Sequence, residues 1–328
     1  MNKDLTAVDN ALWNRFATPL WSDVASDDEY YNRKPHLAHY TSIANVENIL
    51  RTNELWFANP LYMNDYEEIR FGINQGLEIV TRSVDLRNAC GTSEHFRIFV
   101  EAFEARYHQF AFEHAVDTYV FCLSELDPND NDGLLSMWRG YGGNGSGVAL
   151  VVDAGKIEKP QQSTLVFARV HYDTTLARRT WVEGYVKRVA ALLSQEPVDA
   201  GQLSISATAL FERIKVFALF TKHKGFEEER EWRIVYIRNR DREGGLVDRF
   251  GYSVGARGIE PRLRFKVAPT DGVTAGDFTF ERITDRIILG PTSSSPLSLA
   301  AFQRLLDATH HSDLKARVRA STIPFRDR

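Results

Sequence analysis

Apolar and polar residues alternate along several short stretches of the chain, and this spacing predicts strands. The alternation over residues 36–41 predicts a strand that runs into a helix with apolar positions from Ile43 to Leu50. Either Thr41 or Ser42 can cap that helix at its N-terminus. Further strands are expected over residues 54–58, 117–125, 147–153, 164–173, 229–237, 262–267 and 285–290.

Other segments carry apolar residues at helical spacing. A stripe from Phe96 to Phe110 predicts a helix over residues 93–115. Further helices are expected over residues 5–16, 174–195 and 202–221, after Asn64 or Asp65, and near 297–309. Residues 239–260 are charged and rich in glycine, so we expect a loop there.

The order of these elements predicts a fold class and a domain organisation. Strands come in clusters instead of alternating strictly with helices, which favours an α+β fold with a mixed or antiparallel sheet. We expect an N-terminal extension over residues 1–35 and a single domain over residues 36–328. That domain carries helical insertions near residues 93–115 and 174–221.

Composition narrows the class of protein. Apolar residues make up 43% of the 328 residues, which is enough for a hydrophobic core. The formal net charge of -4 argues against a large non-specific nucleic-acid binder. The two cysteines, Cys90 and Cys122, provide neither a disulfide framework nor a zinc site, and no metal site is expected. The sequence shows no signal peptide and no membrane span, so we expect a cytoplasmic protein.

His39 and Thr41 are the first residues that suggest chemistry. They lie two apart on a predicted strand and therefore share a face. An imidazole and a hydroxyl can together bind the neighbouring hydroxyls of a ribose. The alternative is a core histidine beside a helix cap.

Aromatic residues form two further candidate groups. Trp56 and Tyr66 can flank a flat ring, and Trp138 and Tyr141 precede a cluster of glycines that allows close approach to a ligand. The alternatives are that these side chains fill the core or anchor loops, and that the glycines make a tight turn.

Two carboxylates, Glu229 and Glu231, lie two residues apart where a strand is expected to begin. Carboxylates stabilise the positive charge of an oxocarbenium ion, so this pair suits chemistry at a sugar carbon. The alternative is an ordinary solvated surface in a run of charged residues.

Taken in order, these motifs resemble a bacterial family known as domain of unknown function 2971. The shared motifs are His39–Ser42, Leu55–Ala58 with Met63–Asp65, Phe121–Glu125, Met137–Tyr141 with Gly147–Leu150, and Lys222-His223 with Glu229–Arg233. The resemblance covers roughly residues 36–240.

The layout is also similar, more distantly, to the His-Tyr-Glu type of ADP-ribosyltransferase. The matching motifs are His39-Tyr40-Thr41, Trp56-Phe57-Ala58 with Tyr66, and Glu231. The resemblance implies split β-sheets around a central cleft. It further implies that NAD, as substrate, contacts His39, Tyr40, Thr41, Trp56 and Tyr66, with Trp138 and Tyr141 nearby.

The same resemblance implies a reaction. Glu231 would polarise the 2′-hydroxyl of the nicotinamide ribose and stabilise the oxocarbenium ion, and Glu229 would orient the acceptor nucleophile. The expected function is NAD-dependent ADP-ribosyl transfer or NAD hydrolysis, by a toxin or an anti-phage defence effector with a partner protein. The acceptor is protein, nucleic acid or water.

Two other functions are also considered. Tyr40 is bulky for the middle of the first motif, and Trp56 stands where tyrosine is usual, which favours a module that binds a nucleotide or nucleic acid without turnover. A third reading is a structural partner domain in a defence complex, with the helix over residues 93–115 as its interface.

Overall fold

The chain folds into two compact units, each assembled from three separate segments. The computed structural model describes residues 7–23, 33–63, 66–113, 117–158, 163–241, 243–255, 258–274 and 276–325. Unit 1 comprises Met1–Ser26, Asn59–Thr118 and Val170–Phe226. Unit 2 comprises Asp27–Ala58, Tyr119–Arg169 and Glu227–Arg328. The expected insertions near 93–115 and 174–221 therefore both fall in unit 1.

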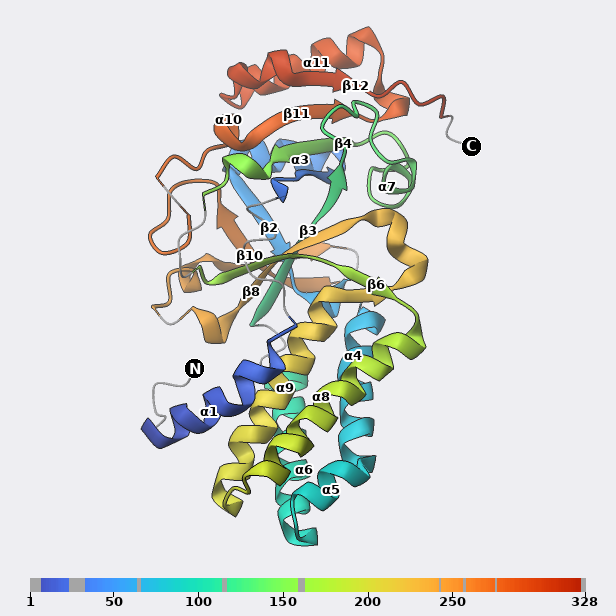
Figure 1. The fold of residues 1–328 in the computed structure, drawn as a ribbon. Helices are drawn as coiled ribbons and strands as arrows, with labels where there is room; N and C mark the ends of the chain where they lie inside the picture. Colours follow the sequence, from blue (N-terminus) through green and yellow to red (C-terminus); the bar gives the residue numbers. More distant parts are fainter. Residues whose placement is uncertain are drawn as a thin grey trace. The chain divides into compact units, whose positions relative to one another are not determined.

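Unit 1 is mainly helical. Its helices are α1 (Ala7–Leu20), α4 (Tyr66–Arg82), α5 (Val84–Ala89), α6 (Ser93–His108), α8 (Thr175–Gln195) and α9 (Leu203–Phe220), with a π-helical turn over Gln109–Glu113. Helix α9 contacts α1, α4, α6 and α8 and is buried along most of its length (Figure 1). An apolar helix is expected at the centre of a bundle, because it has no polar face to present to water. Strands β6 (His171–Asp173) and β7 (Thr221–His223) pair in parallel.

Two glycines set the approach of α4 to α9. A Cβ atom on Gly72 would lie 2.8 Å from Ala218 Cβ, and one on Gly76 would lie 2.9 Å from Ile214 Cγ2. The two glycines are one helical turn apart and thus face the same neighbour. Their missing side chains let the two helix backbones pack closely.

Unit 2 is built on a 10-stranded sheet of described residues. Its main path runs β12-β11-β4-β1-β3-β2-β10-β9, and β8 pairs with both β3 and β5. The pairs whose registers are known are antiparallel except β11 with β12, which are parallel. The strands are β1 (His36–Thr41), β2 (Glu54–Ala58), β3 (Thr118–Leu126), β4 (Val148–Asp153), β5 (Leu165–Arg169), β8 (Glu231–Ile237), β9 (Phe250–Gly255), β10 (Gly258–Lys266), β11 (Thr284–Leu289) and β12 (Val318–Ala320).

Short helices complete unit 2. They are α3 (Ile43–Thr52), α7 (Leu135–Gly140), α10 (Phe280–Ile283) and α11 (Pro296–Ala308), the last lying against β12 (Figure 1). Ser42 is the N-cap of α3, since its side chain accepts a hydrogen bond from the Asn45 amide at 3.2 Å. Short 3-10 helices occur in both units, over Pro60–Tyr62, Ala154–Lys156, Ala200–Gln202, Lys224–Glu229, Arg238–Arg240, Val247–Arg249, Pro291–Ser293 and Ser312–Arg317.

Both faces of the sheet carry buried residues, and successive side chains of each strand contribute to opposite faces. One face carries Leu37 and contributes to the larger core, together with Phe57, Phe121, Leu150 and Trp232. We call it the Leu37 face. The opposite face carries Ala38, and its smaller core contains Tyr40, Trp138, Ala149 and Ile288. We call it the Ala38 face.

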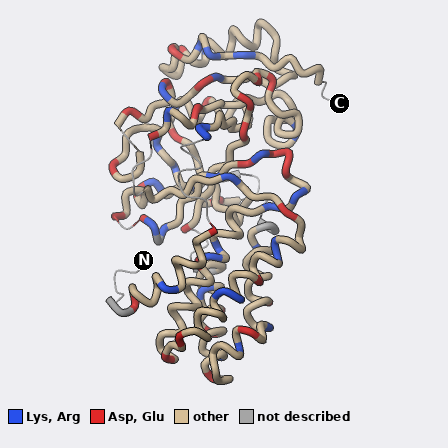
Figure 2. The backbone as a smooth tube through the Cα atoms, viewed as in Figure 1, with Lys and Arg blue, Asp and Glu red and all other residues tan. Residues whose placement is uncertain are grey.

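The predicted α+β class is confirmed, whereas the expectation of a loop over residues 239–260 is wrong from Phe250 onward. Part of this segment forms β9 and the start of β10, which pair in register through Val254 and Ile259. The charges and glycines of the segment obscured the alternation of Phe250, Tyr252 and Val254. Among the described residues, no helix has the length and apolar character needed to cross a bilayer. Charges of both signs are spread along both units (Figure 2).

Candidate functional site

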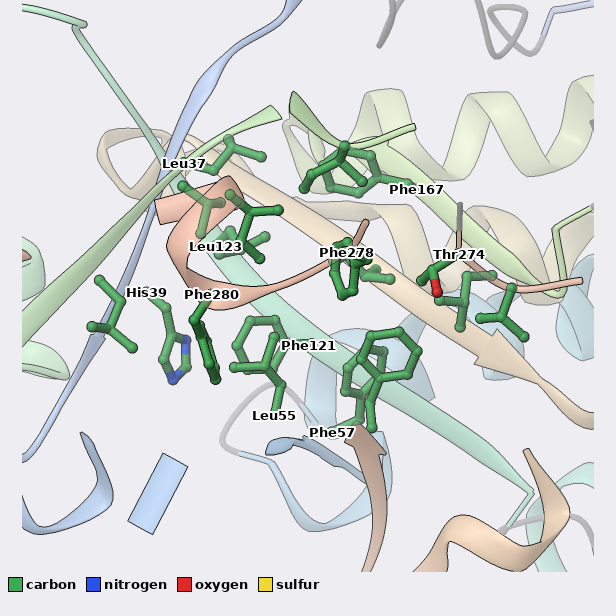
Figure 3. A pocket seen from close by; sticks show the side chains of 18 of the residues that line it. Leu37, His39, Leu55, Phe57, Phe121, Leu123, Phe167, Thr274, Phe278 and Phe280 are labelled. Carbon is green, nitrogen blue, oxygen red and sulfur yellow. The ribbon is translucent and has the colours of Figure 1, made fainter. Parts of the chain in front are cut away.

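His39 lies on β1 and points from the Leu37 face into a cavity of about 90 Å³. Figure 3 shows its imidazole beside Phe280 and near Phe121. The imidazole stacks on Phe121 with ring centroids 4.4 Å apart, and its Nδ1 donates to the carbonyl oxygen of Cys122 at 3.1 Å. Burial lowers the pKa of His39 below its ordinary value of 6.5, and the hydrogen bond to Cys122 partly opposes this shift. His39 is therefore held as a neutral imidazole.

The cavity around His39 is almost entirely apolar. Its described lining residues include Ile234 and Phe265. Figure 3 labels five more of them, which are Leu55, Phe57, Leu123, Phe167 and Phe278. Small-molecule sites usually enclose roughly 300–1,000 Å³, so this cavity is too small for a nucleotide. It is best described as a gap within the larger core.

Tyr40 and Trp138 are brought together on the Ala38 face. Their rings meet edge to face with centroids 4.9 Å apart, and both side chains are buried. The hydroxyl of Tyr40 accepts from the Leu134 amide at 2.9 Å, and the indole of Trp138 donates to the Asp132 carbonyl at 2.8 Å. Burial raises the pKa of Tyr40 to about 12. These contacts indicate packing and loop anchoring.

Thr41 is the last residue of the His39-Tyr40-Thr41 motif, and its side chain hydrogen-bonds to a residue of helix α3. It is buried, and its Oγ1 accepts from Nδ2 of Asn45 at 2.9 Å. Asn45 lies in the first turn of α3. The hydroxyl of Thr41 is thereby engaged within the protein.

Glu231 begins β8 and forms a buried, bidentate ion pair with Arg233. Its Oε1 lies 2.8 Å from Arg233 Nε, and its Oε2 lies 3.0 Å from Arg233 Nη2. The two side chains are 6% and 1% exposed, so the pair is shielded from water. A carboxylate held in this way has less capacity to bind a ribose hydroxyl.

The register of β1 with β3, together with one side-chain hydrogen bond from β8, places Glu231 and His39 on opposite faces of the sheet. Leu37 pairs with Glu125 of β3, and the Trp232 indole donates to Glu125 Oε2 at 2.8 Å, so these three residues share the Leu37 face. His39 follows Leu37 by two residues and shares that face, whereas Glu231 precedes Trp232 by one residue. Glu231 therefore lies on the Ala38 face.

Glu229 lies near Tyr141. The Tyr141 hydroxyl, on a side chain that is 42% exposed, donates to Glu229 Oε1 at 3.3 Å. Ser124 Oγ donates to the backbone carbonyl of Glu229, which fixes the chain just before β8. These two predicted site residues are thus brought together at the surface of unit 2.

Trp56 and Tyr66 lie in different units. Trp56 is in β2 and is 36% exposed; its indole donates to Glu54 Oε2 at 3.1 Å, and Arg264 Cζ lies 5.5 Å from its ring centroid. Tyr66 begins α4 of unit 1, and its side chain lies outside the described residues. The aromatic sandwich expected from these two residues stays a prediction.

Phe121 and Cys122, which hold His39, were not singled out from the sequence as its partners. Arg233, which holds Glu231, lies in the run of charged residues that the sequence offered as an alternative to a catalytic pair. The Arg233 contact had a signal, since residues two apart on a strand share a face. The sequence also did not predict a cavity of about 390 Å³ in unit 1. Its described lining residues are Arg70, Phe71, Asn74, Gln75, Thr175, Arg178 and His223.

Comparison with known proteins gives one family match. Residues 137–234 match a family described as "Protein of unknown function (DUF2971)". The match supports the DUF2971 resemblance over that segment, which contains Trp138, Tyr141, Glu229 and Glu231. No curated protein and no solved structure matches the chain. Within the described part of the chain, no group of three or more His, Cys, Asp or Glu residues is arranged to hold a metal ion.

Proposed function

We propose that this protein binds a nucleotide or nucleic acid without turning it over. The observation that carries this proposal is the placement of His39 and Glu231 on opposite faces of the sheet. The resemblance to a His-Tyr-Glu ADP-ribosyltransferase implies that the side chains of His39 and Glu231 both contact one ribose of the substrate. The bidentate pairing of Glu231 with Arg233 also favours binding without catalysis.

Trp56 is the candidate base-stacking residue of unit 2. Its ring is partly exposed and lies beside the guanidinium of Arg264, and an aromatic ring next to a cation suits a nucleobase near a phosphate. Arg264 is itself oriented by Glu54, at 3.0 Å from Nε and 3.2 Å from Nη2. We propose that this surface stacks one base of the ligand.

The test measures binding and turnover in one sample. The protein is titrated calorimetrically with NAD, ADP and a single-stranded oligonucleotide, and the recovered ligand is analysed for free nicotinamide. We expect binding of at least one probe with the ligand recovered unchanged. Trp56→Ala is expected to weaken binding by about 1–3 kcal/mol. Trp181→Ala, at a tryptophan of similar exposure in unit 1, is the matched control. Absence of binding to all three probes would remove the proposal.

ADP-ribosyl transfer from NAD is the second candidate, because Glu229 and Glu231 flank the start of β8 and Glu229 meets the hydroxyl of Tyr141. In this candidate the fold is of the split-sheet type, and the acceptor is a protein, a nucleic acid or water. Release of nicotinamide by the wild type that is abolished in Glu229→Gln, at unchanged melting temperature, would establish ADP-ribosyl transfer in place of binding without turnover.

A further inference from the structure

The cavity beside His39 lies within the larger core of unit 2 and has a volume of about 90 Å³. Protein cores are close-packed and leave few voids larger than a water molecule. In another protein, an apolar cavity of roughly 150 Å³ stays dry and accepts benzene. The volume of the present cavity therefore suits a ligand of at most one aromatic ring.

Aromatic side chains form much of the cavity wall. Phe121 stacks on Phe57 with ring centroids 5.3 Å apart, and the ring of Phe57 lies 5.5 Å from that of Phe265. Phe278 meets Phe265 edge to face at 6.1 Å. Figure 3 shows Phe57, Phe121 and Phe278 along the cavity. Because aromatic rings pack favourably against one another in stacked and edge-to-face arrangements, this wall favours a flat aromatic occupant.

Most of the other polar groups at the cavity are engaged within the protein. Ser163 Oγ accepts from a backbone amide at 3.1 Å, and Thr274 Oγ1 bonds to a backbone amide and a backbone carbonyl at 2.8 and 3.1 Å. Glu158 is exposed and pairs with Arg282 at 3.4 Å. Thr284 contributes a hydroxyl on a residue that is 2% exposed. The described lining therefore offers a ligand few polar contacts besides His39.

The imidazole of His39 presents a hydrogen-bond acceptor at the wall of the cavity. Its Nδ1 donates to the Cys122 carbonyl oxygen at 3.1 Å, since a carbonyl oxygen can only accept. A neutral imidazole with its proton on Nδ1 has a lone pair on Nε2. The ring makes no second hydrogen bond to any described residue. Stacking on Phe121, with centroids 4.4 Å apart, fixes the orientation of this acceptor.

These features exclude several kinds of occupant. A buried water molecule typically makes about three hydrogen bonds, and His39 and Thr284 together supply fewer than that. A charged ligand would lose its hydration to an apolar wall, which is strongly unfavourable. A ligand with acceptor atoms alone would place a lone pair against that of Nε2. An uncharged ring with one donor satisfies the volume, the aromatic wall and the acceptor together.

We propose that this cavity binds a small, uncharged aromatic molecule with one O–H or N–H group, such as a phenol. The ring packs among the phenylalanines, and the O–H or N–H group donates to Nε2 of His39. Leu55 and Phe57 line the cavity, so Trp56, which lies between them on β2, points to the opposite face of the strand. The cavity is thus separate from the proposed base-stacking surface and goes beyond the proposed function.

The test compares phenol with toluene, in which a methyl group replaces the hydroxyl at nearly the same size. Both probes are titrated calorimetrically into the full chain, as wild type and as His39→Leu, which is close to histidine in volume and has no acceptor. We expect wild type to bind phenol. We expect His39→Leu to lower the ratio of phenol affinity to toluene affinity by about tenfold or more, because a hydroxyl buried without a partner is unfavourable.

His95→Leu is the matched control. His95 lies outside the cavity, and its Nδ1 also bonds to the carbonyl oxygen of a cysteine, Cys90, at 3.2 Å. This variant is expected to leave the affinity ratio unchanged.

Leu123→Phe provides a second variant, because it places a larger side chain at the cavity wall. It is expected to abolish binding of both probes, with the melting temperature reporting its fold. The inference is overturned if wild type does not bind phenol, or if His39→Leu affects phenol and toluene equally. Unimpaired binding by a folded Leu123→Phe variant would likewise overturn it.

Discussion

The imidazole of His311 lies between two acceptors, with its Nδ1 2.6 Å from Glu281 Oε1. Its Nε2 lies 3.0 Å from the carbonyl oxygen of Leu50 in α3. Glu281 belongs to α10, and His311 is the residue before the 3-10 turn Ser312–Arg317. One buried side chain thus joins three segments of unit 2 that are far apart in the sequence.

Replacing His311 is expected to destabilise the protein. His311→Ala removes both hydrogen bonds and should lower the free energy of unfolding by about 2–4 kcal/mol. Urea unfolding followed by circular dichroism measures the change. His310→Asn is the matched control, because His310 is exposed and has a φ of 65°, which asparagine tolerates. Equal stability of the two variants would contradict a structural role for His311.

Breaking the ion pair of Glu231 is expected to lower the free energy of unfolding more than a substitution of Glu229 does. Glu231→Gln leaves the guanidinium of Arg233 buried beside a neutral amide, and such losses typically amount to about 3–5 kcal/mol. Glu229 is less buried, so Glu229→Gln should change the free energy of unfolding by less than about 1 kcal/mol. The comparison is made by denaturant unfolding at neutral pH. A Glu231→Gln variant as stable as wild type would show that the pair contributes little.

The stability of the protein should decrease as the pH falls below about 6.5, in part because of His39. Burial lowers the pKa of His39 in the folded state, whereas the unfolded chain retains the ordinary value of 6.5. The unfolded state therefore binds more protons in this range, and acid favours it. His39→Phe keeps a ring against Phe121 and removes the titration.

The measurement is the slope of unfolding free energy against pH between pH 7 and 5. We expect His39→Phe to reduce that slope by up to about 1.4 kcal/mol per pH unit. His310→Asn serves as the control for loss of an exposed histidine. An unchanged slope in His39→Phe would mean that His39 is protonated equally in both states.

Gly147 should tolerate no side chain. A Cβ atom there would lie 2.7 Å from the carbonyl oxygen of Gly142 and closer still to that of Thr41. Gly147→Ala is therefore expected to lower the free energy of unfolding by at least about 2 kcal/mol. Gly184→Ala in α8 meets no atom within 4 Å and should raise it by roughly 0.5–1 kcal/mol. In thermal melting, we expect a lower melting temperature than wild type for Gly147→Ala and a higher one for Gly184→Ala.

The helices and strands were more predictable from the sequence than the arrangement of the candidate site residues. The strands over residues 36–41 and 54–58 were predicted with the bounds that the structure has, because their alternation is clear. Strand β12 spans only Val318–Ala320, too short for a periodic signal, and it depends on pairing with β11. Tertiary contacts decide such elements more than propensity does.

The faces on which His39 and Glu231 lie depend on the pairing of β3 with β1 and β8. A strand pattern shows which residues share a face within that strand. It does not show how the faces of two strands correspond, because a shift of one residue in register exchanges them. The cavity of unit 1 was unpredictable for a related reason: its described lining combines four residues of α4 with two of α8 and one of β7, which are far apart in the sequence and form no motif.

The position of β1 inside the sheet has a consequence for folding. Strand β1 is paired on both edges, with β3 and β4, and β4 in turn pairs with β11 near the end of the chain. During synthesis β1 emerges long before any of these partners, and the segments of unit 1 are made between them. Contacts of such long sequence separation slow folding. We therefore expect the sheet to assemble late on the ribosome, and refolding from denaturant to be slow compared with that of a helical bundle.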